Sequence, residues 1–364
     1  MLSTYLATAG INLAALLFLA GLLQSTGINQ ARRKPFLAGV FLTIGVILAE
    51  AGTLTAQDGN TAWRSLNLAS NAVGFMLTPL IPLVLAAIFD NGTLRRHAWL
   101  AVPAGLNAVA ALLSPWFGLL FSVDETNHYA RGGLFWLFIA AYGIHVVFLA
   151  MVTLRATRRL FHPVQGRVIG LLLFAVAGTA VQLVFPAVLV SWHCVTLALI
   201  LYYQILSEFD NSLDPLTGLL NRAAYEKAVS RLTGHGHLAV IVMDINDFKA
   251  INDTYGHDYG DAALRHVASI IQDAFDGTCG VYRIGGDEFC VICRHTDAAR
   301  IERQIRRMVS GLERERLRDS HLPTLAYGIG ISRNRDRLDF QQTLKHADEQ
   351  MYRYKQRQKR KAAI

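Results

Sequence analysis

Acidic side chains are scarce in the first part of this 364-residue chain: residues 1–207 hold only five, against 22 in residues 208–364. A region with so few charges between long apolar runs is typical of membrane helices and excludes an ordinary water-soluble domain. The net charge of +8 could indicate nucleic-acid binding, but much of the basic excess lies in short loops between apolar runs. Membrane topology explains that charge better, and we expect no nucleic-acid partner.

Cysteine is also rare, with four residues, Cys194, Cys279, Cys290 and Cys293. Cys290 and Cys293 have the spacing of some redox and metal sites, but both lie in a predicted strand, where residues three apart point to opposite faces. No second Cys/His pair accompanies them, as a zinc site would require. We therefore expect buried structural thiols.

Long apolar runs fill the first part of the chain, and a bilayer span takes about 20 such residues. Five runs have that length: Tyr5–Leu23, Phe36–Ala56, Leu66–Phe89, Ala98–Phe121 and Leu134–Leu154. The stretch Val168–Leu206 is too long for one span, and Pro186 divides it in two because proline interrupts a helix. The pattern predicts an all-α polytopic membrane domain over residues 1–206 with about seven transmembrane helices.

Basic residues are distributed unevenly among the loops. Clusters follow the first, third and fifth runs, whereas the alternate loops hold only Arg64 and Arg131 beside acidic residues. The positive-inside rule then places the N-terminus outside and the C-terminal region in the cytoplasm. No basic segment precedes the first run, so we do not expect a cleaved signal peptide.

Five consecutive residues, Gly285-Gly286-Asp287-Glu288-Phe289, carry the strongest chemical signal in the chain. They lie between two short apolar segments, which is the pattern of a strand, a tight turn and a returning strand. The glycines permit a turn with positive φ and a close approach of the backbone to a ligand. Two adjacent carboxylates at a turn suit a metal ion, although a solvated acidic hairpin has the same pattern.

Around this hairpin, the chain from Asp214 onward alternates between strand and helix periodicities. Predicted strands cover residues 237–243, 281–284, 290–293 and 325–331, and predicted helices cover 221–232, 261–275, 298–312 and 340–355. This order predicts an α+β sandwich with a mainly antiparallel sheet and a β-α-β-β-α-β core.

Polar residues at the strand ends complete a candidate site. Asp244 ends the first predicted strand, and beside the hairpin it could share a divalent cation with Asp287. Asn252 and Asp261 offer an amide and a carboxylate, a combination that can read the edge of guanine. Asp261 alone is equally compatible with a helix N-cap.

These residues together resemble the GGDEF family of diguanylate cyclases. The similarity extends from Asp214 to near Lys359 and rests on several separate motifs in the expected order. These are the Asp214–Arg222 segment, Asp244 with Phe248-Lys249, Asn252-Asp253, Gly256-His257, Gly260-Asp261, Arg283 with the hairpin, and Ala347-Asp348 with Tyr352 and Lys355. The resemblance implies a nucleotide-cyclase or palm-like fold for residues 214–364, after a short signalling linker at 207–213.

The resemblance also implies an activity and its site. Two GTP molecules would condense to cyclic di-GMP and pyrophosphate in a homodimer, at the cytoplasmic face of a bacterial inner membrane. Asp287 and Glu288 would be catalytic, and Mg²⁺, or alternatively Mn²⁺, would bind Asp244, the Ile245 carbonyl, Asp287 and Glu288. GTP would contact Phe248, Lys249, Asn252, Asp261, Gly285, Gly286, Lys355 and Lys359.

Two departures from the family pattern stand out. Many relatives carry an Arg-x-x-Asp product-inhibition motif at positions that are Asp276 and Cys279 here, so we predict no such site. Relatives often have aspartate at Asn246, a change that we expect to be tolerated.

Other functions fit parts of the pattern. A catalytically silent receptor for GTP or cyclic di-GMP would share the fold, but it would not need the complete set of acids. A transporter with a nucleotide-sensing tail is disfavoured by the few intramembrane charges and the lack of an inverted repeat.

A small-molecule or physical stimulus would act on the membrane region, and polar residues at membrane depth are candidates to sense it: Glu50, Asn67, Asn71, Asn107, Gln182, His145 and His193. For the amides, interhelical hydrogen bonding is the simpler expectation.

Overall fold

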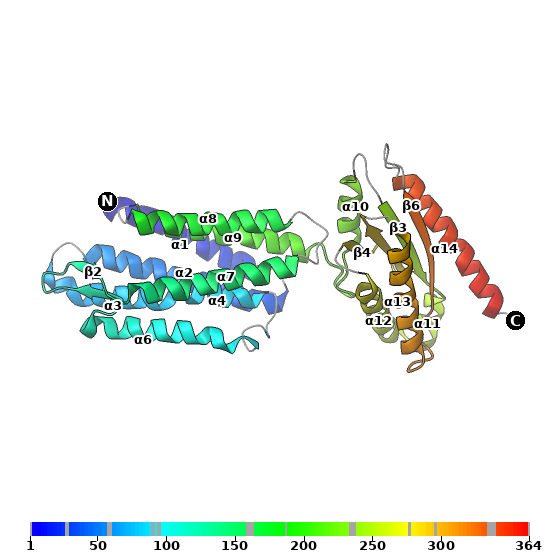
Figure 1. Cartoon of the computed structure of the whole chain (residues 1–364), viewed down its shortest axis with the longest axis horizontal. Helices are drawn as coiled ribbons and strands as arrows, with labels where there is room; N and C mark the ends of the chain where they lie inside the picture. The colour runs from blue at the N-terminus through cyan, green and yellow to red at the C-terminus, as the bar shows by residue number, and fades with distance from the viewer. Residues whose placement is uncertain are drawn as a thin grey trace. The chain divides into compact units, whose positions relative to one another are not determined.

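The computed structural model describes residues 2–25, 29–56, 60–88, 92, 96–157, 164–185, 188–232, 238–275, 278–294, 297–332 and 340–362. The chain divides into two compact units, of which the first ends at Asp210 and the second begins at Asn211 (Figure 1). Each unit has hydrophobic cores of its own.

The first unit is a bundle of helices. It comprises α1 (Leu2–Ser25), α2 (Gln30–Ala56), α3 (Arg64–Leu77), α4 (Leu80–Leu85), α6 (Ala101–Phe117), α7 (Phe135–Thr157), α8 (Val164–Val184) and α9 (Ser191–Asp210), with 3₁₀ turns η1 (Thr61–Trp63), η2 (Ala86–Ile88) and η3 (Ala98–Leu100). Pro79 lies between α3 and α4, where a residue without a backbone N–H interrupts the helical hydrogen bonds.

Five segments of the described chain are long and apolar enough to cross a membrane: Leu2–Ser25, Gln30–Ala56, Thr61–Ile88, Ala98–Phe117 and Phe135–Arg155. The stretch that we divided at Pro186 does form two helices, α8 and α9, but α8 contributes only a shorter apolar segment, Gly166–Gln182. The seven-span count therefore stays a prediction.

The fourth predicted span is wrong at its C-terminal end. The helix stops at Phe117 because Gly118 adopts a left-handed conformation with φ of 60°. Phe121, which we assigned to the span, instead begins strand β1 (Phe121–Val123), which pairs with β2 (Tyr129–Arg131) in a small hairpin. The sequence reasoning missed this hairpin, because its strands have only three residues each.

Of the four amides for which we expected interhelical hydrogen bonds, Asn107 and Gln182 form them, whereas Asn71 bonds to Asn67 within its own helix. Asn107 donates to the carbonyl of Phe75 at 2.8 Å, which joins α6 to α3. Gln182 on α8 donates to the carboxylate of Glu50 on α2 at 2.9 Å. The buried Asn67 donates to Asn127 in the β1–β2 turn at 2.9 Å, so the polar side chains of the bundle are linked to that hairpin.

The second unit is a four-stranded antiparallel sheet with helices on both faces. Its strands are β3 (Leu238–Ile245), β4 (Cys279–Arg283), β5 (Glu288–Cys293) and β6 (Leu325–Ser332), in the order β4-β5-β3-β6. Its helices are α10 (Arg222–Ser230), α11 (Phe248–Tyr255), α12 (His257–Ala274), α13 (Ala298–Arg316) and α14 (Phe340–Ala362). The predicted antiparallel β-α-β-β-α-β core is thus present, with the first connection split into two helices.

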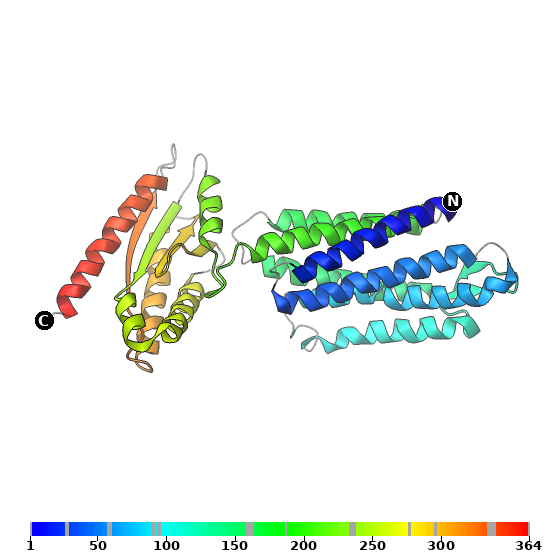
Figure 2. The ribbon, with the colours of Figure 1, turned by 180° about the vertical axis from the view of Figure 1, so that it is seen from behind.

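Alternation along β3 assigns each face of the sheet to its own helices. Odd-numbered residues such as Ile241 and Met243 pack with α12 and α13, whereas Val240 and Val242 pack on the side of α10 and α14. Figures 1 and 2 show α12 and α13 on one side of the sheet and α14 along the other, beside β6. Because side chains alternate, Asp244 continues the face that α14 covers.

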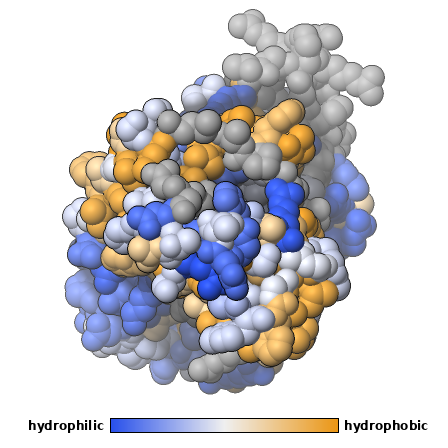
Figure 3. Space-filling model, turned by 90° about the vertical axis from the view of Figure 1, so that its left-hand side faces the viewer, coloured by the Kyte–Doolittle hydropathy of each residue, from blue (hydrophilic) through white to orange (hydrophobic). Residues whose placement is uncertain are grey.

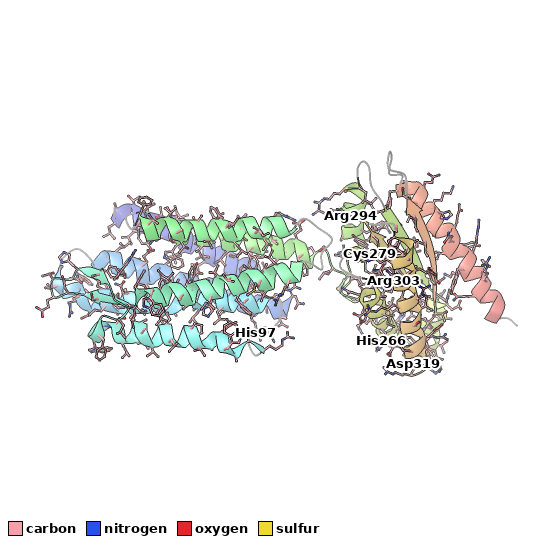
Figure 4. The ribbon with its side chains drawn as sticks, viewed as in Figure 1. His97, His266, Cys279, Arg294, Arg303 and Asp319 are labelled. Carbon is pink, nitrogen blue, oxygen red and sulfur yellow. A yellow bond between two sulfur atoms is a disulfide. The ribbon has the colours of Figure 1, made fainter. Side chains whose placement is uncertain are left out.

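The expectation of buried thiols is wrong for two of the four cysteines. Cys279 and Cys293 are opposite each other in the β4–β5 register and form a disulfide; Figure 4 labels Cys279 on β4. Cys290 is a buried free thiol on the other face, as the alternation within its strand predicts, and Cys194 is also free. The pairing depends on the register between two strands, which the spacing within one strand does not reveal.

Candidate active site

Asp244 and Glu288 lie opposite each other where β3 meets β5. They are register partners in the antiparallel pair, and both face the side of the sheet that α14 covers. The Asp244 side chain is buried, whereas Glu288 is exposed. Two carboxylates at directly opposite positions repel each other unless a cation is present, so the sheet itself builds a place for positive charge.

Asp287 is tied to the same place through its backbone. Its carbonyl accepts a hydrogen bond from the N–H of Ile245 at 3.1 Å, which holds the hairpin turn against the end of β3. Asp244, Ile245, Asp287 and Glu288 are the four predicted metal ligands. The fold brings the backbones of all four residues together at the end of β3.

Lys355 supplies a positive charge at this position. Its Nζ donates to Asp244 Oδ1 at 2.6 Å, and both side chains are mostly shielded from solvent. Two glycines of β6 explain how α14 comes so near. A Cβ on Gly328 would lie 2.0 Å from the carbonyl oxygen of Ala347, and one on Gly330 would lie 2.0 Å from that of Thr343. Only glycine allows this close packing, which positions the C-terminal half of α14 over Asp244.

Arg283 clamps the hairpin turn. Its guanidinium donates to the carbonyl of Gly286 from Nε at 3.2 Å and from Nη2 at 2.7 Å, and Nη1 donates to Asp214 Oδ1 at 3.0 Å. Burial alone would raise the pKa of Asp214, but hydrogen bonds from Thr217 and Arg283 and the charge of Arg283 lower that pKa below its usual value. The carboxylate of Asp214 is therefore a fixed anchor for Arg283.

The hairpin glycines differ from our expectation. Neither Gly285 nor Gly286 has a positive φ, so the turn does not use the left-handed conformation that glycine permits. A Cβ on Gly285 would lie 2.6 Å from Glu288 Oε2, so the exposed Glu288 side chain would have to move. Nothing lies within 4 Å of the corresponding position on Gly286, so this backbone is open to a ligand.

Of the predicted guanine-reading residues, Asn252 on α11 lies beside Gly260 of α12, which directly precedes Asp261. A Cβ on Gly260 would lie 1.9 Å from Asn252 Oδ1 and 3.4 Å from the ring of Phe248. The missing side chain of Gly260 therefore lets Asn252 reach the turn of α12 that holds Asp261. The Phe248 ring packs against the core and so holds the start of α11 on the second unit.

The remaining predicted residues are less defined. Lys249 is exposed on α11. The side chain of Lys359 lies outside the described residues. Of the two positions at which relatives carry the product-inhibition motif, Asp276 lies outside the described residues and Cys279 is in the disulfide. The prediction that no such inhibitory site exists therefore stays a prediction.

The donor chemistry fits a magnesium-type ion. Carboxylate and carbonyl oxygens are its preferred ligands, and it commonly uses one or two carboxylates together with substrate phosphates. Within the described part of the chain, no cluster of three or more His, Cys, Asp or Glu side chains is arranged to hold a metal. Asp244 and Glu288 form a two-carboxylate set whose coordination phosphate oxygens would complete.

Sequence reasoning missed the residues that support this site. Asp214 and Arg283 were recognised only as parts of motifs, although an arginine directly before the hairpin signals a clamp. Asn246 is buried, and its Nδ2 donates to Thr324 at 2.8 Å and to Gln358 at 2.6 Å, while its Oδ1 has no partner among the described residues. No local pattern links these distant residues, since β3 and α14 meet only in the folded chain.

Comparison with known proteins identifies the second unit. Residues 211–361 match the family described as "Diguanylate cyclase, GGDEF domain". Over 162 residues the chain is 30% identical to diguanylate cyclase DosC of Escherichia coli K12, covering 43% of this chain and 35% of that protein. It is 33% identical over 148 residues to the probable diguanylate cyclase DgcC of the same organism, covering 39% of this chain and 40% of the relative.

A solved structure is also similar. The coiled coil and GGDEF domain of DgcB from Caulobacter crescentus, in complex with c-di-GMP, shares 24% identity with a TM-score of 0.38. The match covers 43% of this chain and 86% of that one. The chain thus spans between a third and two fifths of the length of the curated relatives named above.

Proposed function

Since residues 211–361 form a GGDEF domain, we propose that the protein is a membrane-bound diguanylate cyclase, which condenses two GTP molecules to cyclic di-GMP and two pyrophosphates. The observation that carries this proposal is the cluster of Asp244, Glu288 and Lys355 at the end of β3. A receptor that only bound nucleotide would gain nothing from two opposed carboxylates, whereas a phosphoryl-transfer site uses them to hold a cation.

Each residue of the site would have a separate role in binding or reaction. Asp244 and Glu288, together with Asp287 and the Ile245 carbonyl, would hold a divalent metal ion, here Mg²⁺, which when bound neutralises charge that develops on the transferring phosphate. Lys355 would exchange its contact with Asp244 for a phosphate oxygen when the nucleotide arrives. The open backbone of Gly286 and the start of α11 would approach the phosphates, and Asn252 with Asp261 would read guanine.

Each GTP reacts as both nucleophile and electrophile. The 3′-oxygen of one ribose forms a bond to the α-phosphorus of the other nucleotide, the bond between that phosphorus and the bridging oxygen breaks, and pyrophosphate leaves. The exposed Glu288 would accept the 3′-hydroxyl proton. One domain holds one GTP, so the reaction requires two domains facing each other in a homodimer.

The first unit would anchor the enzyme in the bilayer. Many large apolar side chains are exposed on its helices, including Phe18, Trp116 and Phe117, at 70%, 76% and 70%. A water-soluble surface rarely carries so many, whereas lipid would cover them. We place the N-terminus outside and the cyclase in the cytoplasm of a bacterial inner membrane, with seven spans.

Signal transfer would follow α9 from the membrane unit to the cyclase. Two ion pairs hold its C-terminal end to other helices of the bundle: Asp210 with Arg32, and Glu208 with Arg167 at 2.8 Å. Arg32 also lies over the ring of Phe209. A shift of this helix end against its partners would change how two cyclase domains meet.

The test uses full-length protein in nanodiscs with GTP and Mg²⁺, and detects cyclic di-GMP and pyrophosphate. Asp287→Ala should abolish both products, whereas Glu302→Ala, the same truncation at an exposed acid of α13, should not. Stoichiometric GTP binding without turnover in dimeric protein would favour the silent receptor. Product that persists in Asp287→Ala would refute the assignment of the site.

A further inference from the structure

The helical unit contains a cavity of about 610 Å³. Its walls come from α2, α3, β2, α7, α8 and α9, and it has the size of a small-molecule site. All the helices that line it do so near the end of the bundle that carries the β1–β2 hairpin. Figure 3 looks onto that end, where hydrophilic residues gather beside hydrophobic ones. Nothing in the cyclase chemistry uses this cavity.

A fixed carboxylate defines one side of the cavity. Glu50 accepts a hydrogen bond from the Tyr5 hydroxyl at 2.7 Å on one oxygen and from Gln182 Nε2 at 2.9 Å on the other. The amide of Gln182 is itself oriented, because its Oε1 accepts from the backbone N–H of Ser191 at 3.1 Å. Both hydrogen-bond partners of Glu50 are neutral, while His193 on α9 interacts with its charge. A buried carboxylate is stabilised further when a ligand cation joins it.

Aromatic rings form another part of the cavity wall. Phe75 and Phe138 meet edge to face at 4.9 Å, Phe135 lies 5.8 Å from Phe138, and Tyr142 stacks with Phe138 at 6.4 Å. All four line the cavity with Glu50. Ring faces attract cations and give apolar contact to an organic body, so rings beside a carboxylate favour an organic ammonium ion.

Arg131 limits the charge that such a ligand can carry. It lines the cavity from β2, with its guanidinium 4.8 Å from the centre of the Phe135 ring. A second ammonium group in the ligand would be repelled by this guanidinium, whereas a neutral or anionic group would not. Polyamines are therefore disfavoured.

We propose that this cavity binds a small molecule with one ammonium group on an apolar or aromatic body, with the ammonium on Glu50 and the body on the aromatic wall. The ammonium could belong to a soluble amine or to the headgroup of an aminophospholipid. The ligand would be the stimulus of the proposed cyclase, because Ser191, Trp192 and Val195 line the cavity at the start of α9, whose other end leads to the second unit. The role of the ligand as a stimulus rests on the proposed function, but the binding of the ligand to the cavity does not.

Calorimetry with the full-length protein tests the site directly. The protein is placed in nanodiscs of phosphatidylglycerol alone and titrated with 2-phenylethylamine, and heats from empty nanodiscs are subtracted. 3-Phenylpropanoate is the matched anion and spermidine the matched polycation. Glu50→Gln removes the charge and keeps the shape, while Glu125→Gln makes the same change at an exposed acid of the β1–β2 turn, outside the cavity lining. No GTP is present, so an inactive cyclase would not affect the result.

We expect saturable binding of 2-phenylethylamine that Glu50→Gln weakens about tenfold or more and that Glu125→Gln leaves unchanged. The anion and spermidine should bind at least about tenfold more weakly. If Glu50→Gln does not fold, Phe138→Leu should still weaken binding about threefold, because it removes a ring and keeps apolar volume. Weaker amine binding in discs that contain phosphatidylethanolamine would identify the lipid headgroup as the ligand, and unchanged binding would identify a soluble amine. Absence of saturable binding, or equal binding to the Glu50→Gln protein, would overturn the proposal.

Discussion

Replacing Arg283 with methionine should loosen the hairpin that holds Gly286, Asp287 and Glu288. Methionine keeps most of the apolar stem of Arg283 and removes its donors. Two contacts then disappear: a charge-assisted hydrogen bond to Asp214 and the shared hydrogen bonds to the carbonyl of Gly286. The side chains of Arg283 and Asp214 are only 14% and 17% exposed, so solvent would replace these contacts poorly.

The expected loss follows from the types of contact. A hydrogen bond to a charged group contributes about 1.5–3 kcal/mol and a neutral one about 0.5–1.5 kcal/mol. Asp214 keeps its hydrogen bonds from the Thr217 N–H at 2.8 Å and hydroxyl at 2.6 Å, which reduces the loss. We therefore expect the free energy of opening the hairpin to fall by about 2–4 kcal/mol, which corresponds to a fall of about 30- to 700-fold in the protection of hairpin amides from exchange.

Hydrogen exchange with mass spectrometry, on the full-length protein in nanodiscs, would measure this change in peptides covering residues 281–290. The matched control is Arg318→Met, which removes an exposed ion pair with Glu315 and should alter exchange by less than about threefold. Equal protection of the hairpin amides in the wild type and in Arg283→Met would refute the claim that Arg283 holds the hairpin turn in place. Cyclase activity should fall in parallel, since the clamp positions Asp287.

Low pH should weaken the same clamp: the pKa of Asp214 is lower in the folded protein than its unfolded value of about 3.9. Its stabilisation is therefore complete above about pH 5 and is lost as the pH falls through the folded pKa. The protection of hairpin amides from hydrogen exchange should depend less on pH in the Asp214→Asn variant than in the wild type over this range. The same pH dependence in both proteins would count against a role for the Asp214 carboxylate. Lys355→Gln should lower kcat/KM for GTP about 10- to 100-fold in a pyrophosphate-release assay, because it removes the cation beside Asp244; an unchanged value would exclude a phosphate contact. The disulfide between Cys279 and Cys293 conflicts with the proposed cytoplasmic position of the second unit, because the cytoplasm keeps thiols reduced. If the unit is cytoplasmic, both cysteines should be alkylated without prior reduction in cells that are acid-quenched, denatured and alkylated. Alkylation that requires prior reduction would place this unit in an oxidising compartment.

Local patterns predicted most elements of the second unit. Short apolar runs and turn residues located β3, β5 and β6, and helical periodicity located α12, α13 and α14, because each signal lies within a short stretch of chain. The same reasoning failed for the disulfide between Cys279 and Cys293. That pair depends on a register between two strands, and register is decided by which faces are buried together.

In the first unit, composition predicted helices and their approximate bounds, but it could not locate the cavity. Glu50, Arg131 and Phe138 come from three separate elements, and only the packing of the bundle brings them to one space. The end of the fourth span was misplaced for a related reason. Apolar residues continue beyond Phe117, and the left-handed conformation of Gly118 ends the helix within that apolar run.

The sequence by itself determined the chemistry of this protein: acids and glycines in the hairpin, Asp244 at a strand end, and apolar runs of bilayer length. These features are local, so spacing and residue type suffice to recognise them. Tertiary structure decided how the groups meet. Gly328 and Gly330 let α14 approach β6 and set Lys355 on Asp244, and Asp214 fixes Arg283 across 69 residues of chain. Such contacts depend on packing between distant segments, for which no short stretch of sequence carries a signal.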